Sequence, residues 1–273
     1  MKKIIFTMML GLLLPSVAAA QNQDDDFGLW YSVGASKKLS QKLSVEAEVE
    51  YRTFDDAKKT DRWSGGVGLD YKVLPWLKAS AGYTFLYDKR RKESFSYYDD
   101  EDDEGEAWEG FVKKYKSATF WSPRHRFNVD LTFSQNIGRF KLSLRERWQY
   151  TYRPEKTATR DVYEYAYDTD GNLDTDYCTT ESESKTYSSK GKNVLRSRLQ
   201  VDYNIPNCKV DPFASAELYN SWAVKKVRYS VGADWKLTKQ HVFTVAYRYQ
   251  DLRGDYDDEP DMHIVSVGYK FKF

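Results

Sequence analysis

The chain has 273 residues, of which 41% are hydrophobic and 16% aromatic, and its formal net charge is +1. The near-neutral charge gives no reason to expect nucleic-acid binding, and a mean hydropathy of -0.75 excludes a bundle of apolar membrane helices. A polar chain rich in Tyr and Trp suits a β-barrel, in which only alternate residues face lipid.

The first 20 residues have the features of a secretory signal peptide. Lys2 and Lys3 precede the apolar run 4–14, and three alanines end the segment at Ala20. The apolar run is shorter than the roughly 20 residues that a spanning helix needs. We therefore expect cleavage before Gln21 and a mature domain over residues 21–273, with an uncleaved anchor as the alternative.

Eleven segments of the mature chain alternate apolar with polar residues. In residues 43–54 the apolar set of Leu43, Val45 and Val49 alternates with a set that includes Glu46, Glu48 and Glu50. A period of two sends these sets to opposite faces of a strand, whereas a helix would mix them. The predicted strands are 27–38, 43–54, 62–73, 76–88, 124–136, 140–152, 194–205, 210–220, 227–237, 241–252 and 262–273.

We predict an all-β protein, a transmembrane antiparallel up-and-down β-barrel of about 10–12 strands. Because bacterial single-chain barrels normally have an even number of strands, we expect ten or twelve rather than eleven. Glu146 breaks the alternation, because it falls on the apolar face of its strand. Either a carboxylate tolerated locally near the aromatic rim or a β-bulge explains this position.

The connections predict the orientation of the barrel. Four are short turns, at residues 74–75, 137–138, 206–207 and 238–240, and two are long, at residues 89–122 and 154–192. In barrels of this class the carboxyl end and the short turns lie on the periplasmic side. The two long segments are therefore expected to be extracellular, the second with a hairpin whose Gly171 takes a positive φ.

The last strand carries a recognisable terminal signal. Tyr269, Phe271 and Phe273 lie on one face of the strand, and the chain ends on the last of them. This pattern resembles the closing strand that the barrel insertion machinery reads in outer-membrane proteins. We expect that machinery and outer-membrane lipid to be the protein's partners, in a Gram-negative bacterium.

Several phrases resemble one family of outer-membrane proteins. They are DFGLWYSVGASKKLSQKLSVEAEVEYR, RWSGGVGLDYKVLPWLKASAGYTF, HRFNVDLTFSQNIGRFKLSLRERWQY, LRSRLQVDYNIP and IVSVGYKFKF. Together they are similar to the Gram-negative family catalogued as domain of unknown function 2490. The resemblance spans the mature chain and implies an outer-membrane barrel, without a catalytic motif or cofactor.

The residues predict neither catalysis nor a cofactor or metal site. Barrel lipid hydrolases pair a Ser nucleophile with a His two residues away, and no Ser lies two residues from His125, His241 or His263. The acidic residues from Asp168 to Asp174 lack calcium-loop spacing, and the acidic run 99–104 is typical of a solvated loop. The two cysteines, Cys178 and Cys208, are not expected to form a disulfide.

The predicted lumen carries opposed charges. Its candidate network consists of Glu46, Glu48, Glu50, Arg145, Arg147, Arg196, Arg198, Arg228 and Arg248. Paired rows of this kind plug a small barrel, whereas an arginine-rich wall suits a narrow anion-preferring pore; both readings stay open. The tryptophans predicted to form interfacial girdles are Trp30, Trp63, Trp76, Trp148 and Trp235.

These observations predict a non-enzymatic structural barrel or narrow pore. The alternatives are a surface adhesin or partner-binding barrel that acts through residues 89–122 and 154–192, with an extracellular or periplasmic partner, and an outer-membrane lipid hydrolase. A soluble lipocalin-like barrel is the alternative to the membrane location.

Overall fold

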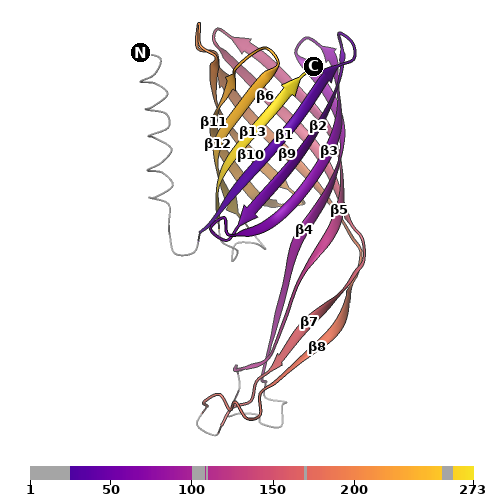
Figure 1. The fold of residues 1–273 in the computed structure, drawn as a ribbon, viewed down its shortest axis with the longest axis vertical. Coiled ribbons are helices and arrows are strands. Elements are labelled where there is room, and N and C mark those ends of the chain that lie inside the picture. The colour runs from indigo at the N-terminus through magenta and orange to yellow at the C-terminus, as the bar shows by residue number, and fades with distance from the viewer. Residues whose placement is uncertain (1–24, 100–107, 109, 169–170, 254–260) are drawn as a thin grey trace. The chain divides into compact units, whose positions relative to one another are not determined.

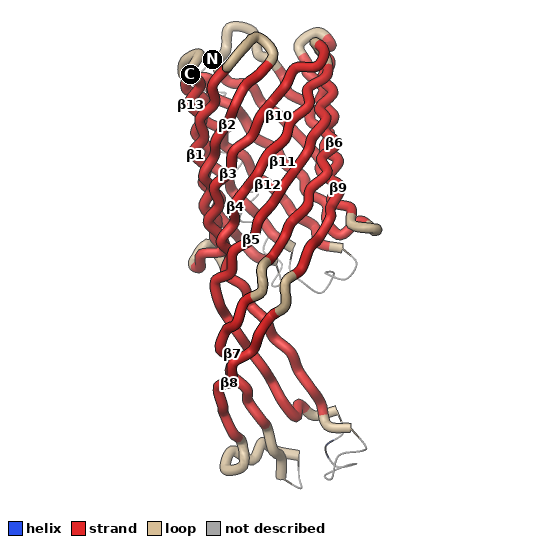
Figure 2. The backbone as a smooth tube through the Cα atoms, turned by 90° about the vertical axis from the view of Figure 1, so that its right-hand side faces the viewer, coloured by secondary structure: helices blue, strands red, loops and turns tan. Residues whose placement is uncertain are grey.

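A computed structural model describes residues 25–99, 108, 110–168, 171–253 and 261–273. All thirteen named elements in these ranges are strands, as Figure 2 shows. Their bounds are β1 Asp26–Lys38, β2 Leu43–Phe54, β3 Lys59–Leu74, β4 Leu77–Tyr97, β5 Val112–Ile137, β6 Phe140–Arg153, β7 Lys156–Glu164, β8 Thr179–Tyr187, β9 Lys190–Tyr203, β10 Val210–Asn220, β11 Val224–Lys236, β12 His241–Leu252 and β13 Met262–Lys272. None of the described residues forms a helix with the length and apolar composition needed to cross a membrane. The predicted signal peptide lies outside the described residues.

Eleven strands close into a barrel (Figure 1). Strands β1 to β6 follow one another around it, β9 to β13 complete it, and β4 also pairs with β5. The closing pair, β1 and β13, is parallel, with Asp26 opposite Met262 and Ser36 opposite Lys272. The expectation of an even strand number is therefore wrong: the first and last of eleven up-and-down strands point the same way, so the barrel closes on a parallel pair.

The short turns lie at the rim that holds the carboxyl end, called the C-terminal rim here. Backbone hydrogen bonds join neighbouring turns and chain ends there, from Phe273 N to Ser36 O, from Lys272 N to Gln240 O and from Lys236 N to Lys209 O. Figure 1 shows the carboxyl end at this rim. The prediction that the short turns and the carboxyl end share one side is confirmed.

The outward faces are apolar, as the alternation predicts. Large exposed side chains on β3 and β5 include Trp63, Val67, Leu69, Val129 and Leu131. Such a continuous apolar exterior with a polar interior is the arrangement of barrels that face lipid.

Trp30 is an exception to the predicted girdle. Its side chain is only 5% exposed, whereas Trp63, on the outward face of β3, is 51% exposed. The guanidinium of Arg52 lies 3.7 Å from the centre of the Trp30 ring. The girdle assignment of Trp30 is wrong, because its place in the β1 alternation turns it into the charged lumen, where its ring face attracts cations.

Glu146 sits on the outward face of β6 without a bulge. The β5–β6 register is continuous and places Glu146 opposite Leu131. Ser197 Oγ, on β9, donates a hydrogen bond of 2.6 Å to a Glu146 carboxylate oxygen. A β-bulge at Glu146 is excluded, and the carboxylate instead takes a partner on the neighbouring outward face.

The second compact unit consists of residues 87–124 and 153–190. Within it β7 pairs with β8 from Lys156 opposite Tyr187 to Glu164 opposite Thr179. Strands thus occupy much of the segments predicted as long connections, because β4 and β5 continue past their predicted ends. The β7–β8 pair confirms the hairpin predicted within residues 154–192. Gly171 has a φ of +79°, which confirms its predicted turn conformation.

The second unit has an aromatic core of its own. Tyr98, Trp108 and Tyr167 form a mutually contacting triangle, with the two tyrosine ring centres 5.2 and 6.0 Å from the indole and 6.3 Å from each other. Tyr98 is buried and donates a hydrogen bond to Tyr165 O at 2.9 Å.

In the second unit, a hydrogen bond from Lys114 holds the pKa of Glu164 below its usual range. Both cysteines, Cys178 and Cys208, are free in the structure.

The parallel closure can be tested by crosslinking. A Cβ added at Gly268 would lie 3.0 Å from Ser32 Oγ on the opposite strand, close to the Cβ-to-sulfur separation in a disulfide. We expect Ser32→Cys/Gly268→Cys, in a Cys178→Ser/Cys208→Ser background, to form a disulfide that speeds migration in a non-reducing denaturing gel. The control Ser36→Cys/Gly268→Cys should remain reduced, and crosslinking of the control alone would refute the register.

Candidate functional site

A polar cavity of about 720 Å³ occupies the barrel interior on the side of the C-terminal rim. Its lining extends from Leu74 and Pro75, in the turn between β3 and β4, to Glu50 on β2. Its space comes from inward positions that carry little or no side chain, among them Gly66 and Gly82. Neighbouring strands lie close to those glycines: a Cβ on Gly82 would meet Asn128 Oδ1 at 3.0 Å.

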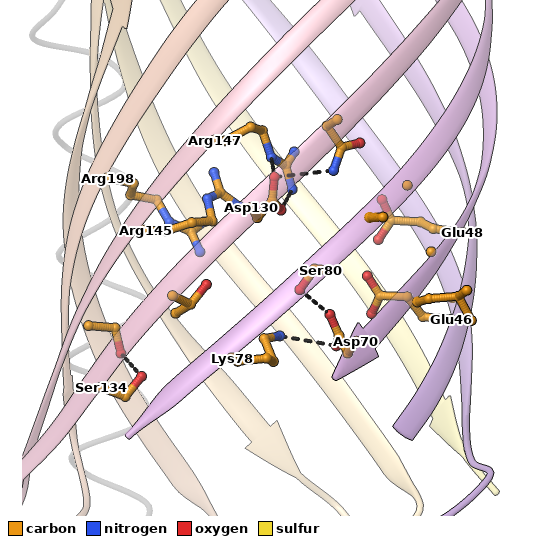
Figure 3. A pocket seen from close by; sticks show the side chains of 18 of the residues that line it. Glu46, Glu48, Asp70, Lys78, Ser80, Asp130, Ser134, Arg145, Arg147 and Arg198 are labelled. Carbon is orange, nitrogen blue, oxygen red and sulfur yellow. Dashed lines mark hydrogen bonds and ion pairs between the residues drawn. The ribbon is translucent and has the colours of Figure 1, made fainter. Parts of the chain in front are cut away.

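One wall of the cavity is acidic. Glu46 accepts a hydrogen bond of 2.7 Å from Lys270, and Asp70 accepts bonds from Lys78 at 3.0 Å and from Ser80 at 2.5 Å. Figure 3 shows Glu46, Glu48 and Asp70 together on this wall. The glutamates share one wall because β2 places Glu46, Glu48 and Glu50 at alternate positions.

The wall opposite is basic. Figure 3 shows Arg145, Arg147 and Arg198 across the cavity from the glutamates. Arg147 binds Asp130 with two hydrogen bonds, of 2.7 Å from Nε and 2.5 Å from Nη2, which is the strong bidentate arrangement. Seven carboxylates and seven cationic side chains line the cavity in all, so the cavity itself has no excess charge of either sign.

A buried ion-pair layer, centred on Glu217, lies in the lumen beside the cavity. Glu217 is 4% exposed. It accepts hydrogen bonds from Arg145 at 2.5 Å, from Arg196 at 2.9 Å and from Tyr219 at 2.8 Å. Arg228 lies 3.8 Å away. We call Glu217, Arg145, Arg196 and Arg228 the Glu217 layer; they come from β10, β6, β9 and β11, which are four consecutive strands of the sheet.

The structure brings together some of the predicted lumen residues and not others. Arg145, Arg196 and Arg228 meet at Glu217. The glutamate row binds elsewhere: Glu50 pairs with Arg52 of its own strand at 2.7 Å, and Glu46 pairs with Lys270. Arg198 lines the cavity, and Arg248 donates to Ser266 Oγ at 3.2 Å. Of the predicted arginines, Arg145, Arg147 and Arg198 stand across the cavity from Glu46 and Glu48.

Sequence reasoning missed the carboxylates that bind the arginines. Glu217 and Asp130 are both buried acceptors of guanidinium groups. The alternation of residues 210–220 does contain the signal, since Glu217 and Tyr219 fall on the face that carries Ser215. The predicted up-and-down order already makes residues 140–152 and 194–205 neighbouring strands, as β6 and β9 are, but it does not give the register that brings Glu217 within reach of their arginines.

The remaining candidate residues form no second site. The rings of His125, His241 and His263 each contact a tyrosine hydroxyl through Nδ1, at 2.8, 2.8 and 2.6 Å. Asp168 accepts a hydrogen bond of 2.8 Å from Asn172 N, as in a turn. No group of potential metal ligands occurs among the described residues, and residues 100–104 of the acidic run lie outside them. Tyr269, Phe271 and Phe273 lie at the C-terminal rim, where Tyr269 bonds His241.

This fold, with its lipid-type exterior and charged lumen, is that of the outer-membrane β-barrel class. The chain belongs to the family described as Protein of unknown function (DUF2490), whose profile matches residues 27–259. The resemblance found in the sequence is thereby confirmed. No curated protein matches the chain.

Solved structures with a similar fold are barrels of low sequence identity. The β domain of the Bordetella autotransporter BrkA has a TM-score of 0.48 at 10% identity, over 85% of this chain and 82% of that one. The translocator domain of the autotransporter NalP from Neisseria meningitidis has a TM-score of 0.46 at 12% identity, over 91% of each chain. The outer-membrane protease OmpT from Escherichia coli has a TM-score of 0.37 at 10% identity, over 76% and 73%.

Proposed function

We propose that the protein is a non-enzymatic barrel of the Gram-negative outer membrane whose lumen is closed to solutes at rest. In this proposal the C-terminal rim and the cavity face the periplasm, and the Glu217 layer separates the cavity from the other rim. The protein then serves as a structural barrel, and only displacement of the layer would open a narrow passage.

The observation that carries the proposal is the burial of Glu217 among three arginines. A carboxylate that is 4% exposed and holds two guanidinium groups within 2.9 Å is itself shielded from water, which supports a packed rather than a water-filled lumen at this level. Four strands contribute to the layer, so opening it requires several charge-assisted hydrogen bonds to break. The cavity beside it has balanced charge and no described metal-ligand group, which suits a vestibule.

The histidines support the non-enzymatic part of the proposal. A serine hydrolase needs an imidazole nitrogen within hydrogen-bond reach of the nucleophile. The Nδ1 atom of each of the three histidines faces a tyrosine hydroxyl, His263 Nε2 contacts Asp25 Oδ2 at 3.1 Å, and no hydrogen bond joins a histidine to a serine among the described residues. The outward pair of Glu146 and Ser197 has a carboxylate where a catalytic serine needs its base.

Liposome swelling tests the closed lumen. We expect proteoliposomes that contain the mature wild-type protein to stay impermeable to glycine and to arabinose, like protein-free vesicles. Heat-modifiable migration in a gel would verify that the barrel has folded. Uptake of either solute in proportion to the amount of folded protein would overturn the proposal.

A second candidate function is partner binding through the second compact unit. Residues 87–124 and 153–190 form a unit with its own hairpin and aromatic core. Within it β8 stands at the end of the strand order, and its row of backbone groups suits the addition of a partner's strand. Replacing residues 156–187 by a short Gly/Ser linker should abolish any surface binding and leave barrel insertion intact; loss of insertion would contradict this division of roles.

A further inference from the structure

Positive charge accumulates around Trp30 in the lumen. Three guanidinium groups lie over or beside this indole: Arg52 at 3.7 Å, Arg228 at 4.8 Å and Arg248 at 5.4 Å from the ring centre. Arg228 is only 7% exposed. Cation–π attraction accounts for their placement, but a ring face does not neutralise a charge.

A second group of cations surrounds Tyr219. Lys226 Nζ lies 4.3 Å from this ring centre, the Arg196 guanidinium 4.5 Å and the Arg228 guanidinium 5.1 Å. Lys226 and Tyr219 face each other across the β10–β11 pair. Arg228 contacts both rings, so the two groups form one continuous cluster, which we call the lumen cation cluster: Arg52, Arg196, Lys226, Arg228 and Arg248.

The carboxylates that contact this cluster are too few to balance it. Among the described residues, Glu217 pairs with Arg196 and Arg228, and Glu50 pairs with Arg52. Glu217 is also shared with Arg145. Two carboxylates, Glu217 and Glu50, therefore face six cationic side chains, namely the five of the cluster and Arg145. In the cavity toward the C-terminal rim, by contrast, carboxylates and cations are equal in number.

Hydrogen-bond donors in the cluster also lack acceptors. The Nε atoms of Arg196 and Arg228 are buried and donate to no acceptor among the described residues. Lys226 forms no ion pair with a described carboxylate, and its ammonium instead contacts the face of the Tyr219 ring. Buried charges and buried donors both carry a large desolvation cost unless a partner of opposite charge meets them.

We infer that the lumen cation cluster binds a small oxyanion of two or more negative charges, of the class of inorganic phosphate, between Lys226, Arg228 and Arg248. The planar forks of the guanidiniums match the oxygen atoms of such an anion, and the lysine adds a point charge. Chloride carries a single charge and has no oxygen atoms, so it cannot accept the paired hydrogen bonds of a guanidinium fork. The inference rests on the proposed closed lumen, because the Glu217 layer is what holds Arg196 and Arg228 in place beside the site.

The test is calorimetric titration of inorganic phosphate into the folded, detergent-solubilised mature protein at low ionic strength and pH 7. We expect saturable binding of one phosphate per chain. Lys226→Met and Arg248→Met should each weaken the binding about tenfold or more. The matched control is Lys141→Met, which removes a lysine from the cavity wall and should bind phosphate like the wild type.

Two outcomes would overturn the inference. One is a folded wild-type protein that shows no saturable heat with phosphate; the other is binding that Lys226→Met and Arg248→Met leave unchanged. Equal competition by chloride at the same ionic strength would overturn the oxyanion class. Failure here is distinguishable from failure of the closed lumen, because an impermeable barrel without phosphate binding refutes the anion site alone, and solute uptake refutes the closed lumen.

Discussion

Glu217→Gln is expected to lower the free energy of unfolding by about 3–5 kcal/mol, the usual cost of removing one partner from a buried ion pair. The substitution keeps the shape of the side chain and removes its charge. Arg145, Arg196 and Arg228 would then face one another without their shared carboxylate. Denaturant unfolding of the refolded protein, followed by tryptophan fluorescence, measures the change.

The matched control for this substitution is Glu46→Gln. Glu46 also pairs with a cation, Lys270, but both side chains are more than 40% exposed. An exposed pair contributes about 0–1 kcal/mol, so the control should unfold nearly like the wild type. Equal effects of the two substitutions would contradict the role of Glu217 as the centre of a buried layer. Combining Glu217→Gln with Arg145→Gln should recover part of the loss, because it removes one of the unpaired charges.

Gly232→Val is expected to destabilise the barrel by about 3 kcal/mol, at the upper end of the usual range for overpacking. A Cβ at this position on β11 would lie 2.5 Å from Val245 O, 2.6 Å from Ala246 Cβ and 2.8 Å from Phe213 Cζ. The closest of these atoms is backbone, so a neighbouring strand would have to move. The fraction of protein that migrates as the folded form in an unheated gel should fall sharply.

Gly65→Ala provides the matched control for Gly232. Gly65 lies in β3, and an added Cβ there meets no heavy atom within 4 Å. This substitution should leave the folded fraction within experimental error of the wild type. A folded fraction for Gly232→Val that equals that of Gly65→Ala would show that the β10–β12 region is packed less tightly than described above.

The alternation of residues predicted most of the barrel because it follows from strand geometry alone. The outward positions of Trp63, Val67 and Leu131 come directly from the period of two. Trp30 follows the same rule and faces the lumen; its assignment to the girdle gave residue type more weight than its place in the alternation. The eleven predicted segments already imply a parallel pair between the first and last strands, a consequence that the expectation of an even strand number passed over.

The pairing of charges could not be predicted, because it depends on strand register and on which side chains reach one another. The predicted order already makes residues 140–152 and 194–205 neighbours, but the register that lets Arg196 on β9 and Arg145 on β6 share Glu217 is not written in the alternation. Residues 89–122 and 154–192 were predicted in part. The Asp-Gly turn indicated a hairpin within residues 154–192, which β7 and β8 form, whereas the continuation of β4 and β5 into residues 89–122 was not predicted, because that segment is mostly polar.

The closed lumen is tested most directly by single-channel recording in a planar bilayer. The wild-type protein should give no stable conductance steps, and Arg145→Ala/Arg147→Ala should stay silent, because Arg196 and Arg228 still hold Glu217. The triple substitution Arg145→Ala/Arg196→Ala/Glu217→Ala removes most of the layer and should open steps that favour anions, since Arg52, Lys226 and Arg248 remain in the lumen. Stable steps from the folded wild-type protein, of the same size as those of the triple variant, would contradict the account.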